Sequence, residues 1–203
     1  MSALADTRCT AFAGHRRIAA GALRHVALVA QREQQGGTGE VRVFDDRTGQ
    51  PIELDLRGDP TALLKRLATA AVAEPGDVEA DGAADPPARR GPGRPRLGVV
   101  SREVTLLPRH WQWLAVQPGG ASVALRRLVE QARRTHAGDD RARAAQEAAY
   151  RFMATLAGDA PGFEDATRAL FAGDAAGFEE RIAAWPEDVR DHAALLAAEA
   201  FSG

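Results

Sequence analysis

The pattern of apolar and polar residues near the start of the chain indicates a hairpin and a helix. Residues 9–14 read as a short strand, Gly14 and His15 favour a tight turn, and residues 17–20 return as a partner strand. Over residues 22–34 the apolar side chains recur every three or four positions, which is the spacing of one helix face. The first block of the chain therefore predicts a strand, a second strand and a helix.

The same order of elements follows in the next block. Residues 41–43 and 52–56 alternate apolar and polar side chains, and the turn-forming run 45–49 lies between them, so a second hairpin is predicted. Asp59 supplies a helix cap and Pro60 suits the first helical position, which predicts a second helix.

We interpret the two blocks as an approximate duplication of one strand-strand-helix unit. They predict an α+β domain over residues 1–72, with a small antiparallel four-stranded sheet and two helices on one face. The other face of such a sheet is expected to be polar.

Three further segments follow this domain. Residues 73–98 offer almost nothing to bury and predict a flexible linker rich in Pro, Gly and Arg. Residues 99–135 predict a strand over 99–107, a helix that begins at Pro108, and an amphipathic helix capped by Ser122. Residues 136–203 predict an acidic all-helical bundle.

A weak 15-residue repeat lies within the predicted bundle. Residues 160–165 match residues 175–180, and Leu170 matches Trp185. Each repeat predicts one short helix, the first closed by Gly173 and the second by Pro186.

The formal net charge of −2 conceals a basic block between two acidic ones. Residues 86–134 contain ten arginines and two glutamates, a net charge of +8, whereas residues 1–85 carry −3 and residues 135–203 carry −7. The chain has no Asn and one Lys, a bias typical of a GC-rich genome that raises the number of arginines. Such a bias does not explain why acidic residues are nearly absent from 86–134, so the clustering points to an anionic partner.

The order of elements in the basic block resembles the ribbon-helix-helix fold of bacterial DNA-binding regulators. The resemblance covers about 35 residues and is carried by Pro108, Leu114, Gly120 and Ser122. It implies that two chains pair their strands into a ribbon that enters the major groove of DNA.

A second resemblance lies in the preceding linker. Gly93-Arg94-Pro95-Arg96 is similar to the Gly-Arg-Pro core of minor-groove hook motifs, in which arginines enter a narrow A·T groove.

These features predict a non-enzymatic DNA-binding or regulatory protein that uses the basic segment 89–134. The predicted DNA contacts are arginines of this segment: Arg89, Arg90, Arg94, Arg96, Arg102 and Arg109. In the alternative hypothesis the protein is an interaction or scaffold module, and the basic segment docks on acidic helices of its own chain or of a partner. The interface residues in that case are Leu106, Trp111 and Trp113. The two tryptophans are two residues apart on a helix and point in different directions, and core packing of both is favoured over an interface.

The sequence contains no motif that predicts catalysis. It lacks a phosphate-binding loop, a dinucleotide fingerprint, a nucleophile elbow and a His-Glu-x-x-His pair, and its five histidines are scattered. Asp45 and Asp46 suit a turn better than a metal site, and Cys9 is expected to be a buried small hydrophobe. We therefore expect no catalytic residues, no metal and no cofactor.

With no apolar run long enough for a membrane span and no signal peptide, a cytoplasmic location is expected.

Taken whole, the chain resembles an uncharacterised bacterial family known as domain of unknown function 2239. Four stretches carry the resemblance: residues 93–98, 104–111, 117–122 and 184–192. The family implies no activity.

Overall fold

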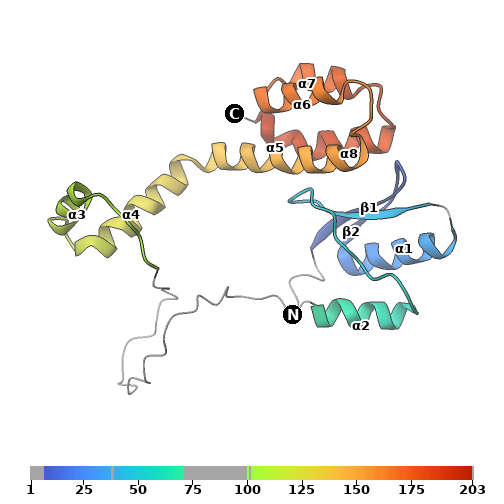
Figure 1. The fold of residues 1–203 in the computed structure, drawn as a ribbon, viewed down its shortest axis with the longest axis horizontal. Helices are drawn as coiled ribbons and strands as arrows, with labels where there is room; N and C mark the ends of the chain where they lie inside the picture. The colour runs from blue at the N-terminus through green and yellow to red at the C-terminus, as the bar shows by residue number, and fades with distance from the viewer. Residues whose placement is uncertain (1–6, 38, 71–99, 101, 203) are drawn as a thin grey trace. The chain divides into compact units, whose positions relative to one another are not determined.

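The computed structural model describes residues 7–37, 39–70, 100 and 102–202, which form two compact units (Figure 1). The first unit combines the described residues up to 70 with residues 136–202, and the second contains the described residues from 100 to 135. Residues 1–72 and 136–203 were predicted to be separate domains, whereas the described parts of both share one core in the structure. The predicted flexible linker 73–98 lies outside the described residues.

The sheet of the first unit has three antiparallel strands in the order β2-β1-β3. They are β1 (Arg8–Ala13), β2 (Arg16–Ala22) and β3 (Val41–Asp45). The predicted hairpin at the start of the chain is confirmed, and Gly14 in its turn has a φ of +57°, where a Cβ would be strained. On the central strand, Thr10 lies opposite Ala20 of β2 and Phe44 of β3.

The predicted fourth strand is absent from the described residues. The returning chain forms one bridge, between Phe44 and Pro51, and Ile52 N donates to Val43 O at 2.7 Å. Residues 52–58 then leave the sheet, because side chains from two helices satisfy their backbone. The prediction of a four-stranded sheet, and of a complete duplication, is therefore wrong.

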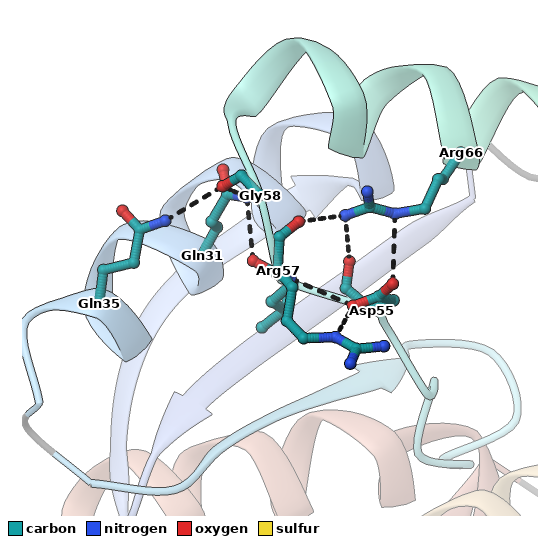
Figure 2. A network of polar contacts seen from close by, with 7 residues as sticks. Gln31, Gln35, Asp55, Arg57, Gly58 and Arg66 are labelled. Atoms are coloured by element: carbon teal, nitrogen blue, oxygen red, sulfur yellow. Dashed lines mark hydrogen bonds and ion pairs between the residues drawn. The ribbon is translucent and has the colours of Figure 1, made fainter.

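Figure 2 shows the polar contacts that hold this departing segment. Gln31 Nε2 donates to Leu56 O at 2.9 Å and to Gly58 O at 3.2 Å, while Arg66 Nη2 donates to Asp55 O at 2.7 Å. The alternating apolar residues of the segment pack instead against the core beneath α1: Ile52, Leu54 and Leu56. Their alternation reflects burial of one side of an extended chain, and not strand pairing.

Helix α1 (Leu23–Gln35) covers one face of the sheet, and α2 (Pro60–Ala70) packs against α1. Asp59 Oδ1 accepts a hydrogen bond from Ala62 N at 2.9 Å, so the predicted cap of α2 is confirmed. The two helices and the strands enclose a core of small and branched side chains: Cys9, Ala11, Leu23, Val26, Ala27, Ala30, Val43, Leu63 and Leu67.

Helices from the end of the chain cover the opposite face of the sheet, which was predicted to be polar. They are α5 (Ala137–Leu156), α6 (Phe163–Ala172), α7 (Ala175–Ile182), α8 (Glu187–Ala197) and the 3-10 turn η2 (Ala198–Phe201). Phe12 and Phe44 project from the strands onto Phe152 of α5, with ring centroids 5.3 Å and 5.0 Å apart. The polar-face prediction is wrong because both faces of β1 are buried.

Three hydrogen bonds between distant residues fix the helices on the sheet. Arg42 Nη1 donates to Thr155 O at 2.9 Å, and Arg151 Nη1 donates to Thr48 O at 3.1 Å. At the other end of the sheet, the backbone N–H of Arg17 donates to Asp188 Oδ2 at 2.8 Å.

The predicted repeat corresponds to α6 and α7. Leu170 and Trp185, at matching positions, are both buried, and Gly173 ends α6 with a φ of +71°. Trp185 Nε1 donates to Pro161 O at 2.9 Å, so the second repeat is bonded to the start of the first.

Candidate nucleic-acid interface

The second unit is a helical hairpin of α3 (Pro108–Ala115) and α4 (Gly120–Thr135). Pro108 occupies the first turn of α3, as predicted, and Leu107 O accepts from His110 N at 2.8 Å. Gly119 and Gly120, with φ of +82° and +75°, make the turn between the helices. Ser122 does not cap α4, because the helix already begins at Gly120.

The hairpin buries little apolar surface of its own. Leu114 of α3 and Ala124 of α4 are its buried hydrophobic residues among those described, with 3% and 1% of their surfaces exposed. Trp111 and Trp113 are 43% and 48% exposed, so the expectation that both pack in a core is wrong. Leu106 is half-buried. The two tryptophans are thus available to contact a partner.

The predicted strand before α3 does not form among the described residues. Residues 102–107 have no strand beside them to supply hydrogen bonds, and Val104 and Leu107 are 54% and 49% exposed. The strand that the ribbon-helix-helix resemblance implies is therefore not found in the described residues.

All arginines described in the second unit are exposed: Arg102, Arg109, Arg126, Arg127, Arg133 and Arg134. Arg133 and Arg134 each lie 3.4 Å from the carboxylate of Glu130, so their charges are partly neutralised. No ion pair is formed by Arg102, Arg109 or Arg127 with any of the described residues. The other predicted DNA contacts, Arg89, Arg90, Arg94 and Arg96, lie outside the described residues, as does the hook-like sequence.

The arginines of α4 gather on one side of the helix. Arg126 and Arg133, like Arg127 and Arg134, are seven residues apart, which is close to two helical turns. The four arginines therefore project from one side of the helix, and the two members of each pair are about 10 Å apart along the axis. Arg126 Nε donates to Ser122 O at 3.2 Å, which directs its side chain toward the start of the helix.

A buried polar cluster in the first unit was not predicted. His192 of α8 is 1% exposed, and its Nε2 lies 3.8 Å from Asp46 Oδ1, which accepts a hydrogen bond from Thr10 Oγ1 at 2.7 Å. Phe12 and Phe152 surround the imidazole at centroid distances of 5.5 Å and 4.7 Å, and neither ring nitrogen has a hydrogen-bond partner in the described part of the chain.

Burial lowers the pKa of His192, an effect that Asp46 opposes and Arg17 reinforces. Burial therefore favours the neutral imidazole, which packs among the aromatic rings. The spacing of His192 from Val189 and Leu196 indicates a position on the buried face of a helix. The contact between His192 and Asp46 could not be predicted, because the two residues are distant in sequence.

Two smaller predictions about polar residues are confirmed. Asp45 Oδ1 accepts from the backbone N–H groups of Arg47 and Thr48, both at 2.8 Å, which is the predicted turn. Cys9 is fully buried. Within the described ranges, no group of three or more His, Cys, Asp or Glu side chains is placed to hold a metal ion. No helix in these ranges is long and apolar enough to cross a membrane.

The fold and the site define an α+β protein that carries a basic helical hairpin. The chain belongs to a family of uncharacterised proteins conserved in bacteria (DUF2239), whose model matches residues 8–197. No curated protein and no solved structure matches the chain.

Proposed function

We propose that the protein is a non-enzymatic DNA-binding or regulatory protein whose basic segment, residues 89–134, contacts the phosphates of duplex DNA. The observation that carries the proposal is the exposed arginine stripe of α4, with Arg102 and Arg109 exposed before and within α3. Arg126 and Arg127 of the stripe form no ion pair with the described residues and bind phosphate without first losing one. Arg133 and Arg134 must first separate from Glu130.

The dimensions of the stripe suit a nucleic-acid backbone. Helix α4 is about 24 Å long, and Arg126 and Arg127 lie about 10 Å along its axis from Arg133 and Arg134, a span that suits phosphates of one duplex.

The test is a titration of fluorescently labelled duplex DNA with the full chain. For four phosphate contacts, release of counterions weakens binding about 100-fold between about 50 mM and about 200 mM salt. Replacing Arg102, Arg109 and Arg127 by Gln should weaken binding and lower the salt dependence, by about 0.9 in log–log slope for each phosphate that the variant no longer binds.

The matched control removes the same number of charges from exposed arginines of the first unit: Arg32, Arg47 and Arg181. This variant should bind DNA as the unmodified chain does. Absence of binding at low salt, or binding that does not depend on salt, would overturn the proposal.

A second candidate is a protein-interaction module, which the exposure of Trp111 and Trp113 favours. Aromatic side chains are enriched at the centres of protein interfaces. A partner bound there would protect both tryptophans from solvent, and replacing both by Ala should abolish its capture without affecting the salt-dependent binding of DNA.

A further inference from the structure

Glu130 lies at the centre of the arginine surface of α4. A helix turns by about 100° per residue, so Arg126 and Arg133 form one row along the helix. Arg127 and Arg134 form a second row beside it. Glu130 follows Arg126 by four residues and Arg127 by three, which places it between the two rows and midway along them. All five side chains are exposed, and we call them together the polar face of α4.

The less exposed residues of α4 lie on the other side of the helix. Ala124 is buried, with 1% of its surface exposed, and Ala121 and Leu125 are half-buried. Their positions are about 120° to 180° around the helix axis from Glu130. The hairpin therefore packs through the opposite side of α4, and α3 leaves the polar face uncovered.

The charges across the polar face are positive, negative and positive. A single phosphate backbone along the middle of this face would meet the carboxylate of Glu130, which repels it. The major groove of duplex DNA offers the complementary pattern, since a phosphate backbone borders each side and base edges form its floor. A helix with its side chains is about 10–12 Å across, which suits the major groove of about 12 Å and not the minor groove of about 6 Å.

The floor of the major groove contains one base that suits a carboxylate. An ionised carboxylate only accepts hydrogen bonds. Cytosine presents its N4 amino group there as a donor, whereas guanine presents two acceptors, thymine an acceptor and a methyl group, and adenine an acceptor beside its amino group. Cytosine is therefore the base that matches Glu130.

We propose that α4 lies in the major groove of duplex DNA and that Glu130 selects a C·G base pair by accepting a hydrogen bond from N4 of cytosine. The inference rests on the proposed function, to which it adds the groove and a base preference. In the protein without DNA, the carboxylate of Glu130 lies 3.4 Å from Arg133 Nη1 and from Arg134 Nε. When these two arginines bind phosphates, Glu130 loses both partners, and only a base with a donor replaces them. Glu130 thereby weakens binding to sequences that lack the matching base.

The experiment is a selection of bound duplexes from a pool whose central segment of about 10 base pairs, one turn of the double helix, is randomised. The full chain is mixed with the pool at about 50 mM salt, and the duplexes are sequenced before and after capture. We expect one position at which C·G is enriched about 5-fold or more over the other base pairs.

Two variants of Glu130 test the role of its carboxylate. Glu130→Gln should change the preferred base at that position from C to A, because glutamine pairs with N6 and N7 of adenine. Glu130→Ala should abolish the preference. Both variants should bind an arbitrary duplex more tightly, since Arg133 and Arg134 no longer have an ion pair to lose. Circular dichroism should show an unchanged helix content, because the side chain of Glu130 is exposed.

Glu103→Gln is the control, since it removes the same charge from an exposed residue of the second unit outside α4. This variant should keep the preference for C. The proposal is overturned if no position prefers C, if Glu130→Gln keeps the preference for C, or if Glu103→Gln changes it as Glu130→Gln does. Tighter binding by Glu130→Gln with the base preference unchanged would overturn the proposal and leave the proposed function intact. Absence of salt-dependent binding by the unmodified chain would overturn both.

Discussion

Gly49 lies directly against the backbone of Ala148, where the turn after β3 meets α5. A Cβ atom at Gly49 would be 1.9 Å from the carbonyl oxygen of Ala148, and Gly49 has a φ of +65°. Only glycine permits both this backbone conformation and this approach. The contact determines how closely the sheet packs on the C-terminal helices.

Replacing Gly49 by Ala should therefore destabilise the protein by about 3 kcal/mol or more, because the helix must move away or the turn must rearrange. Gly14→Ala is the matched control, since Gly14 also has a positive φ but has open space around it. That change should cost about 1 kcal/mol, from backbone strain alone. Urea denaturation of both variants measures the difference, and equal losses of stability would contradict this explanation.

Cys9, the only cysteine, should not react with thiol reagents in the folded protein. Burial raises the pKa of its thiol to about 12, with further increases from Asp46 and Asp45, so almost no thiolate is present at pH 8. Labelling at pH 8 should be slow in water and fast in denaturant. Rapid labelling in water would show that β1 opens to solvent far more often than its core position implies.

The stability of the fold should decrease as the pH falls below the ordinary pKa of histidine. The pKa of His192 is lowered in the folded protein from 6.5, so the unfolded chain binds a proton at a higher pH than the folded chain does. The contribution of the neutral His192 ring to the free energy of unfolding is fully present above about pH 6.5 and decreases as the pH falls below this value.

His192→Leu removes this titration together with two ring nitrogens that have no hydrogen-bond partner among the described residues. We expect the free energy of unfolding at pH 7 to stay within about 1 kcal/mol of the unmodified protein. Its decrease between about pH 6.5 and pH 5 should become shallower. An unchanged pH dependence would show that His192 does not contribute to acid sensitivity.

The three tryptophans should differ strongly in their contribution to stability. Trp185→Phe loses the hydrogen bond to Pro161 O and leaves space in the core, which should cost about 1–3 kcal/mol. Trp111→Phe changes an exposed side chain and should cost less than about 0.5 kcal/mol. Thermal unfolding of the two variants compares them directly, and a large loss of stability for Trp111→Phe would show that its ring is covered.

Local signals in the sequence predicted the helices, although the predicted cap of α4 at Ser122 was wrong. Asp59 caps α2 through a bond to a residue three positions away, and Pro108 begins α3 because its ring suits a first helical turn. The end of α6 at Gly173 is likewise determined by the residue at that position. Such features depend on a few neighbouring residues and can be recognised without the rest of the fold.

The errors concern features that depend on distant residues. Residues 52–56 alternate as a strand does, but the side chains of Gln31 and Arg66 hold the segment away from β3. The buried second face of the sheet depends on Phe152, and the contact of Asp46 depends on His192. Alternation shows that one side of a chain is buried and does not identify what covers it.

The candidate interface was only partly accessible to prediction. The charge pattern identified the arginines, because net charge follows from composition alone. The exposure of Trp111 and Trp113 could not be inferred, since their helix is too short for a repeating apolar face to be recognised.

The core of the first unit joins residues from both ends of the described chain, which has a consequence for biosynthesis. Phe12 and Phe44 emerge from the ribosome long before Phe152 and the helix that contains His192. During this interval the sheet has only one of its faces covered, and its aromatic side chains are exposed to other nascent chains and to chaperones. Folding of this unit is therefore completed only after translation of α8, and a stalled chain that lacks α8 is a species prone to aggregation.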